Sequence, residues 1–296
     1  QPGVDHPAGC RGKVLASIAA VSSSTSGTLQ AIITAAGGGA AAFPQSSYVR
    51  WQTTQYTECC LIASQRVYFN IPSSGEGASG TNYNQTTYGY DTMRRRNRTT
   101  TPGGTITFVV YDSRGLVTST YIGTNDEGAT EDDPTGGGSD PDNNMVLVTS
   151  NVYDGGSAGG NGNLTQQTQH VSASESRVTS FTYDFRNRQL TTSGELDTFS
   201  SRTYNNLSQV LQTQQRVANA SGQLLAQSES HYDNRGNVYQ TLQYEVDPDT
   251  GAVGEVLTSN RWYDVAGQLL QSSPAGSSLW NKTAYDSLGR PVLSAS

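Results

Sequence analysis

The sequence predicts an all-β protein, in which tandem β-hairpins join edge to edge into a long curled sheet. A Tyr-Asp pair recurs along most of the chain, turn-forming residues follow each pair, and the segments between them alternate polar and apolar residues. The composition agrees, because Ser, Thr, Gln, Asn, Gly and Tyr dominate and only 34% of residues are hydrophobic. That is too few aliphatic side chains for the thick core of a compact α/β enzyme.

The Tyr-Asp pair occurs seven times, and an eighth copy has Asn in place of Asp. Successive tyrosines are 21, 42, 30, 21, 28, 31 and 22 residues apart, so one unit of about 21 residues with insertions explains the series. Two strands of about seven residues and a turn fill such a unit, which is one hairpin. The copies are Tyr90-Asp91, Tyr111-Asp112, Tyr153-Asp154, Tyr183-Asp184, Tyr204-Asn205, Tyr232-Asp233, Tyr263-Asp264 and Tyr285-Asp286.

The residues after each pair predict a type I turn that closes a hairpin with a bulge. An Asp side chain at the first turn position accepts from nearby backbone amides, and the fourth position needs a residue that tolerates positive φ. One copy has Asn187 at that fourth position, the commonest choice after glycine. The glycines that occupy it are Gly115, Gly236, Gly267 and Gly289.

The segments between turns have the period of strands. Ile106 and Phe108 share one face of a segment before the second turn, and Val238 and Leu242 share one face after Gly236. A single hairpin is too small to be stable alone, so neighbouring hairpins are expected to pair along their edges.

The chain divides into a lead-in and a repeat array. Residues 1–82 are a poorly defined lead-in, with one expected strand pair at 66–72, and residues 83–296 hold an array of about eight hairpins. The stretch 124–144 contains seven acidic residues and no basic one. It is interpreted as a solvated acidic loop inserted into the array.

The charge argues against nucleic acid as a partner, since phosphate binding requires a basic face and the net charge is −7. The run "MRRRNR" at 93–98 is therefore interpreted as an exposed turn and strand. The uncharged stretch 14–49 is interrupted by "SSSTSGT" and "GGG", so no membrane span is expected. The chain begins at Gln1 without a visible signal peptide, which suggests a piece of a longer protein.

The chain has three cysteines, so at least one of them cannot take part in a disulfide within the chain. Cys59 and Cys60 are adjacent and poorly placed to bridge each other, so either all three are free or Cys10 bridges one of the pair.

Catalytic chemistry is not expected. The three histidines are far apart, and no nucleophile elbow, phosphate-binding loop or zinc-protease motif is present. We therefore predict a non-enzymatic protein without a cofactor.

Calcium is the one metal that the sequence raises. Two acidic sets offer hard oxygen ligands, although neither has the EF-hand spacing, and the interpretation favoured here is solvated loops. The two sets are Asp247, Asp249 and Glu255, and Asp126, Glu127, Asp132 and Asp133.

The aromatic residues divide into two groups. The eight motif tyrosines are expected to fill the layer between neighbouring hairpins, because a polar hairpin has few other large groups to bury. Tyr239, Tyr244 and Trp262 lie outside the motif and are candidate ligand-facing residues for carbohydrate.

A tandem hairpin of about 21 residues with copies such as "YDSRGLV" (111–117) and "YDNRGNV" (232–238) resembles the YD repeat of the RHS family. That family includes bacterial polymorphic toxins, insecticidal toxin complexes, wall-associated proteins and teneurins. The resemblance covers about 83–296, and it implies a sheet that spirals into a β-shell, often around a C-terminal toxic domain. The chain ends in a repeat without the family's C-terminal core region, and "DPDTG" at 247–251 is no basis for transferring protease function.

The resemblance implies a non-enzymatic structural segment of a large bacterial protein, secreted or on the cell surface. Its implied partners are the rest of the same longer chain and an encapsulated C-terminal toxin domain or surface carbohydrate. A carbohydrate- or cell-wall-binding module is the alternative, and a teneurin-like contact surface for adhesion is a third hypothesis.

Overall fold

The protein is seen here in a computed structural model in which the backbone is almost entirely strand and turn. No α-helix occurs in the part of the chain that it describes, and one 3-10 turn covers Gln45–Ser47. The chain divides into two compact units, Gln1–Thr149 and Ser150–Ser296. The described residues are 14, 16–20, 45–136, 143–155, 160–194 and 196–295.

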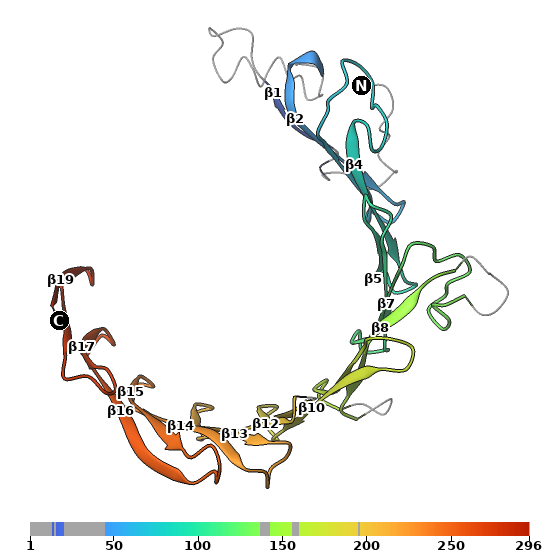
Figure 1. The fold of residues 1–296 in the computed structure, drawn as a ribbon. Helices are drawn as coiled ribbons and strands as arrows, with labels where there is room; N and C mark the ends of the chain where they lie inside the picture. The colour runs from blue at the N-terminus through green and yellow to red at the C-terminus, as the bar shows by residue number, and fades with distance from the viewer. Residues whose placement is uncertain are drawn as a thin grey trace, which may run out of the picture. The chain divides into compact units, whose positions relative to one another are not determined.

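The first unit is an antiparallel meander (Figure 1). Its strands are β1 (Ala16–Ala20), β2 (Tyr48–Tyr56), β3 (Ile62–Tyr68), β4 (Tyr83–Tyr90), β5 (Arg96–Thr100), β6 (Ile106–Tyr111) and β7 (Val117–Gly123). Strand β8 (Val146–Tyr153) runs across the boundary between the units.

The second unit has the same construction. Its strands are β9 (Leu164–His170), β10 (Ser176–Tyr183), β11 (Gln189–Ser193), β12 (Thr198–Tyr204), β13 (Val210–Val217), β14 (Leu224–Tyr232), β15 (Val238–Val246), β16 (Val253–Tyr263), β17 (Leu269–Ser273), β18 (Asn281–Tyr285) and β19 (Pro291–Ala295).

Each strand pairs with its neighbours in sequence, β1 to β7 in the first unit and β9 to β19 in the second. The register shifts by one residue just before a motif tyrosine, as at His231/Tyr232 and Trp262/Tyr263. This is the bulge that a type I turn with a left-handed fourth residue imposes on a hairpin. The predicted all-β class and antiparallel hairpin repeat are confirmed.

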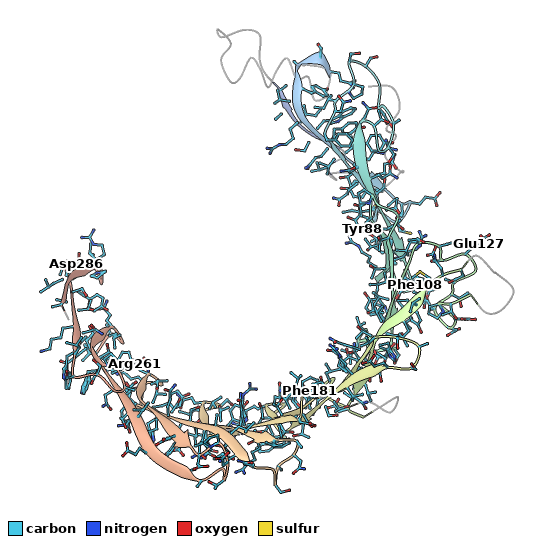
Figure 2. All side chains as sticks on the ribbon, viewed as in Figure 1. Tyr88, Phe108, Glu127, Phe181, Arg261 and Asp286 are labelled. Atoms are coloured by element: carbon cyan, nitrogen blue, oxygen red, sulfur yellow. The ribbon has the colours of Figure 1, made fainter. Side chains whose placement is uncertain are left out.

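Each unit is a single layer of sheet, and side chains project from both of its faces (Figure 2). Buried apolar residues are consequently few. In the first unit, Ile106, Phe108 and Met145 form one buried cluster, which confirms the predicted shared face of Ile106 and Phe108. In the described part of the second unit, Leu224 alone among apolar residues is buried.

The lead-in contains the densest aromatic packing. Trp51, Tyr68 and Tyr83 are buried together, and the rings of Trp51 and Tyr68 stack with centroids 3.9 Å apart. The strand expected at 66–72 lies instead at Ile62–Tyr68 and pairs with both β2 and β4. It ends there because the chain turns at Asn70, whose backbone N–H donates to the carbonyl of Asn82.

The acidic insertion is anchored to the sheet over its described part. Asp126 forms a two-pronged ion pair with Arg98 on β5, and the Glu131 carboxylate accepts from the backbone N–H of Thr92 at 3.4 Å. The solvated acidic loop at 124–144 stays a prediction, and the structure adds these two contacts to it. The sequence does not reveal the ion pair because Arg98 and Asp126 are 28 residues apart and meet only in the fold.

Candidate functional site

The repeated structural element of this chain is the turn that follows each motif tyrosine, and Asp233 shows how it is built. Its backbone N–H donates to the carbonyl of Asn237 at 2.9 Å, and its carbonyl accepts from the N–H of Gly236 at 3.0 Å. Its carboxylate Oδ1 accepts from the N–H groups of Arg235 and Asn237, both at 2.9 Å. One aspartate thus satisfies the backbone groups that a tight turn would leave without partners.

The same pattern recurs along the array. The side-chain oxygen of the second motif residue accepts from the backbone N–H groups two and four residues later. This holds for Asp112, Asp184, Asn205, Asp233, Asp264 and Asp286. Asn205 confirms that the acceptor oxygen, rather than the charge, fixes the turn.

The fourth turn position is left-handed, as predicted. Its φ is 86° at Gly115, 91° at Gly236, 83° at Gly267, 78° at Gly289 and 62° at Asn187. Side chains with a Cβ are strained there, which is why glycine predominates. Arg94 and Ser208 adopt the same conformation at 64° in two further copies, where the sequence pattern does not mark them.

Asp154 keeps this role across a longer loop. Its Oδ1 accepts from the N–H groups of Gly162 and Asn163, and its Oδ2 accepts from the amide of Asn163 at 2.8 Å. The turn therefore tolerates an insertion between the aspartate and the returning strand.

Six motif tyrosines connect their hairpins to the hairpins before them. The phenolic hydroxyl donates to the carbonyl of the residue that lies six positions after the preceding motif tyrosine. Tyr232 donates in this way to Val210 at 3.0 Å, and Tyr263 to Val238 at 3.0 Å. The other recorded pairs are Tyr90 to Ile62, Tyr111 to Arg96, Tyr204 to Gln189 and Tyr285 to Leu269. For Tyr90, the preceding tyrosine is Tyr56 of the lead-in, which begins a further copy of the turn. We call these six hydrogen bonds the tyrosine staples.

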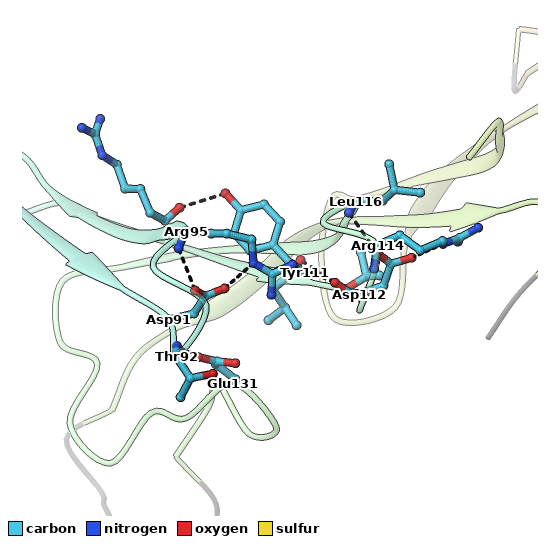
Figure 3. Close-up of polar contacts among 11 residues, drawn as sticks. Asp91, Thr92, Arg95, Tyr111, Asp112, Arg114, Leu116 and Glu131 are labelled. Atoms are coloured by element: carbon cyan, nitrogen blue, oxygen red, sulfur yellow. Dashed lines mark hydrogen bonds and ion pairs between the residues drawn. The ribbon is translucent and has the colours of Figure 1, made fainter. Parts of the chain in front are cut away.

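An arginine strengthens the link at two places. Figure 3 shows the first, where the Arg95 guanidinium pairs with the Asp91 carboxylate at 2.5 Å and donates to the carbonyl of Asp112 at 2.8 Å. Its guanidinium carbon also lies 4.6 Å from the centre of the Tyr111 ring. One side chain therefore contacts its own turn and the next one through hydrogen bonds and a cation–π interaction.

The second arginine link is equivalent. Arg188 pairs with Asp184, donates to the carbonyl of Asn205 at 2.7 Å and lies 4.7 Å from the Tyr204 ring centre. The run "MRRRNR" is thus largely engaged within the protein, since Arg96 lies over Tyr88 and Arg98 pairs with Asp126.

Six turn aspartates have lowered pKa values, namely Asp91, Asp112, Asp154, Asp184, Asp233 and Asp286. At Asp184 and Asp233 the largest cause is a side-chain hydrogen bond, from Arg188 and Asn237 respectively, and backbone N–H donors add to it. At Asp91, desolvation raises the pKa, but hydrogen bonds from the backbone and side chain of Arg95 outweigh it and the net shift is downward. The carboxylates act as structural anions.

Sequence reasoning missed a further copy of the turn in the lead-in. The N–H of Thr57 donates to the carbonyl of Leu61, and Cys60 occupies the left-handed position with a φ of 61°. Cys60 is disulfide-bonded and Cys59 is an exposed free thiol, whereas Cys10 lies outside the described residues. The available signal was "YTECCL", in which Thr replaces Asp and Cys replaces Gly.

Among the residues that the structure describes, the groups that the sequence raised do not come together as a catalytic set. His170 Nε2 lies 3.0 Å from Ser150 Oγ, without a carboxylate bonded to either within the described ranges, and the His231 ring packs near Tyr239. His6 lies outside the described residues.

The two acidic sets do not converge. Asp247 Oδ1 accepts from the N–H groups of Asp249 and Thr250 and so closes the turn between β15 and β16. Asp126 is engaged by Arg98. No group of three or more His, Cys, Asp or Glu side chains arranged for a metal ion occurs among the residues that the structure places. Over those same residues, no helix is long and apolar enough to cross a membrane.

The three candidate ligand-facing aromatics lie apart. Tyr239 is 41% exposed and contacts His231, whereas burial and the neighbouring Glu229 raise the pKa of Tyr244. Tyr244 lies opposite Val256, six residues along β16 from Trp262, which is about 20 Å of extended strand. Trp262 instead stacks on Trp280, a residue that sequence reasoning did not select.

Comparison with solved structures identifies the fold. The chain matches crystal structures of TcdB2-TccC3-Cdc42 (TM-score 0.55, 13% identity, covering 83% of this chain and 13% of that one) and of TcdB2-TccC3 without its hypervariable C-terminal region (0.57, 11%, 82% and 12%). It also matches TcdB2-TccC3 (0.54, 10%, 92% and 14%). No family model and no curated protein matches the sequence.

At these identities the similarity shows a shared fold. This chain spans only about an eighth of each TcdB2-TccC3 chain. The resemblance to YD-repeat proteins is therefore confirmed at the level of the antiparallel repeat sheet.

Proposed function

We propose that this chain is a non-enzymatic wall segment of a larger bacterial repeat protein, secreted or on the cell surface. The wall encloses or presents a partner domain, such as a toxin domain of the same polypeptide. The tyrosine staples carry this proposal, because they bond successive hairpins into one continuous wall. The motif residues therefore serve to hold the sheet together.

Two further observations support a wall. The repeated side chains of the motif are engaged within the sheet: aspartate closes the turn, tyrosine bonds the previous hairpin, and arginine contacts the next. The matched part of this chain covers only 13–14% of the TcdB2-TccC3 chains that share the fold, which fits a segment that acts within a larger assembly.

Limited proteolysis of the complete protein tests this proposal. We expect a partner domain held by the wall to resist trypsin, and to be cleaved faster when two staples are removed by Tyr232→Phe and Tyr263→Phe. Tyr239→Phe is the matched control, because its ring lies in the same unit and takes part in no staple. The proposal would be overturned if trypsin cleaves the partner domain at the same rate in the wild-type protein, in the double variant and in a protein that lacks the array.

A further inference from the structure

Two exposed tryptophans form a stacked pair on the second unit. Trp262 is on β16 and Trp280 directly precedes β18, and their ring centroids are 5.1 Å apart with an interplanar angle of 29°. They remain 41% and 46% exposed. By contrast, Trp51 of the same chain is 3% exposed inside an aromatic cluster. Indole rings are large apolar groups that normally pack, so this half-exposed pair presents apolar ring surface to solvent.

Polar groups lie beside the pair on the same sheet face. Trp262 is directly opposite Gln271 on β17, and Gln271 is directly opposite Lys282 on β18. Directly opposed residues of an antiparallel pair share a face, so these three side chains form one row across three strands.

A side-chain amide pair borders the same row. Asn260 precedes Trp262 by two residues and therefore shares its face. Its Oδ1 accepts from the Gln240 amide on β15 at 2.9 Å. The tryptophan pair consequently has the Asn260 and Gln271 amides and the Lys282 ammonium group as neighbours on its sheet face.

An apolar ring surface beside amide and ammonium groups indicates which class of ligand can bind here. A pyranose ring has an apolar face of C–H groups that stacks on indole and a rim of hydroxyls that needs donors and acceptors close by. A purely apolar partner would cover the Gln271 amide and the Lys282 ammonium group without offering either a hydrogen bond. A nucleic acid would meet a chain with a net charge of −7.

We infer that Trp262 and Trp280 form a saccharide-binding subsite, in which one pyranose ring stacks on the pair and Gln271, Asn260 and Lys282 bond its hydroxyls. The subsite excludes Tyr239 and Tyr244. It is independent of the wall function, because none of its residues belongs to a staple or a motif turn.

Intrinsic tryptophan fluorescence of the whole chain tests the subsite directly. Soluble oligosaccharides of glucose, N-acetylglucosamine and galacturonic acid serve as probes. We expect at least one of them to change the emission saturably, because two of the three tryptophans form the subsite. Trp262→Ala and Trp280→Ala should each weaken binding by about tenfold or more, and Trp262→Phe should retain part of it.

Phe185→Ala is the matched control, because Phe185 is an 85% exposed aromatic in a motif turn far along the sequence from this pair, and it should leave binding unchanged. Circular dichroism of each variant establishes that the sheet is intact, and Trp262→Phe preserves an aromatic ring where alanine disturbs packing. The inference is overturned if none of the three oligosaccharide classes binds, if both alanine variants bind as the wild type does, or if Phe185→Ala weakens binding equally.

Discussion

The aspartate of each motif makes at least three backbone hydrogen bonds, and except in the longer loop after Asp154 these bonds join residues no more than four positions apart. This explains why the turn needs no hydrophobic support. The acceptor roles of aspartate and the left-handed fourth position were both predictable from the sequence, since they are local properties of one turn. The tyrosine and arginine contacts were not predictable. They depend on the distance between neighbouring hairpins, which only the register of the sheet determines.

Gly236 provides the residue-scale test of the turn. Gly236→Val places a β-branched residue at a φ of 91°, so it should lower the free energy of unfolding by about 1–2 kcal/mol. Ala266→Val, one position before the left-handed glycine of the next turn, should have an effect near zero. Denaturant unfolding of both variants measures the difference, and equal midpoints would refute the assigned turn.

The lowered pKa values of turn aspartates such as Asp184 and Asp233 predict acid sensitivity. A carboxylate whose pKa is lower in the folded chain than in the unfolded chain gives its full stabilisation above the unfolded pKa, near 4. That stabilisation is lost as the pH falls through the lowered folded pKa. The melting temperature should therefore decline steeply below about pH 4.

Asp184→Asn separates charge from geometry in this pH dependence. Asparagine retains the acceptor oxygen, as Asn205 does naturally, but does not titrate. The variant should fold and should show a shallower loss of stability below about pH 4 than the wild type. Identical acid profiles, measured by circular dichroism melts, would show that Asp184 does not contribute to the linkage.

At the scale of elements, hairpins of this array are connected by side chains as well as by strand pairing. The array hairpins and the acidic insertion were predictable, because repeats and composition are visible in the sequence. The aromatic cluster of the lead-in was not, since Trp51, Tyr68 and Tyr83 meet only after β2, β3 and β4 pair. The anchoring of the acidic loop escaped prediction for the same reason.

Removing one staple should weaken the contact between two hairpins. Tyr204→Phe deletes the hydroxyl that donates to the Gln189 carbonyl at 2.8 Å and leaves that carbonyl short of a partner. We expect a loss of about 0.5–1.5 kcal/mol in the free energy of unfolding. Tyr239→Phe is the control and should change it little. Equal stabilities of the two variants in chemical denaturation would contradict the staple.

The acidic loop should depend on its ion pair with the sheet. Asp126→Asn removes the charge that pairs with Arg98, so the described part of the loop should be cleaved sooner by an endoproteinase specific for acidic residues. Asp249→Asn, in the turn between β15 and β16, is the control for surface charge. Unchanged cleavage kinetics in Asp126→Asn would show that the ion pair does not hold the loop.

At the scale of the whole molecule, this chain is a repeat protein in which each hairpin mainly contacts its immediate neighbours. Stability in such arrays is approximately the sum of the stability of each repeat and of its interfaces with its neighbours. A mutation in one hairpin should therefore destabilise mainly that hairpin and the two beside it. The shared fold with TcdB2-TccC3 chains agrees with this construction, because a segment of an array can match a segment of a much longer one. The low hydrophobic content follows from the same cause, since one layer of sheet has no interior to fill.

Native-state hydrogen exchange of Tyr232→Phe is the most direct test of the interlocking array. The variant loses the staple to the Val210 carbonyl, so amides of β13, β14 and β15 should exchange about fivefold faster. Amides of β18 and β19 should be unaffected, because they lie more than one repeat away. Unchanged exchange in β13 to β15, or a uniform acceleration throughout the second unit, would contradict the account.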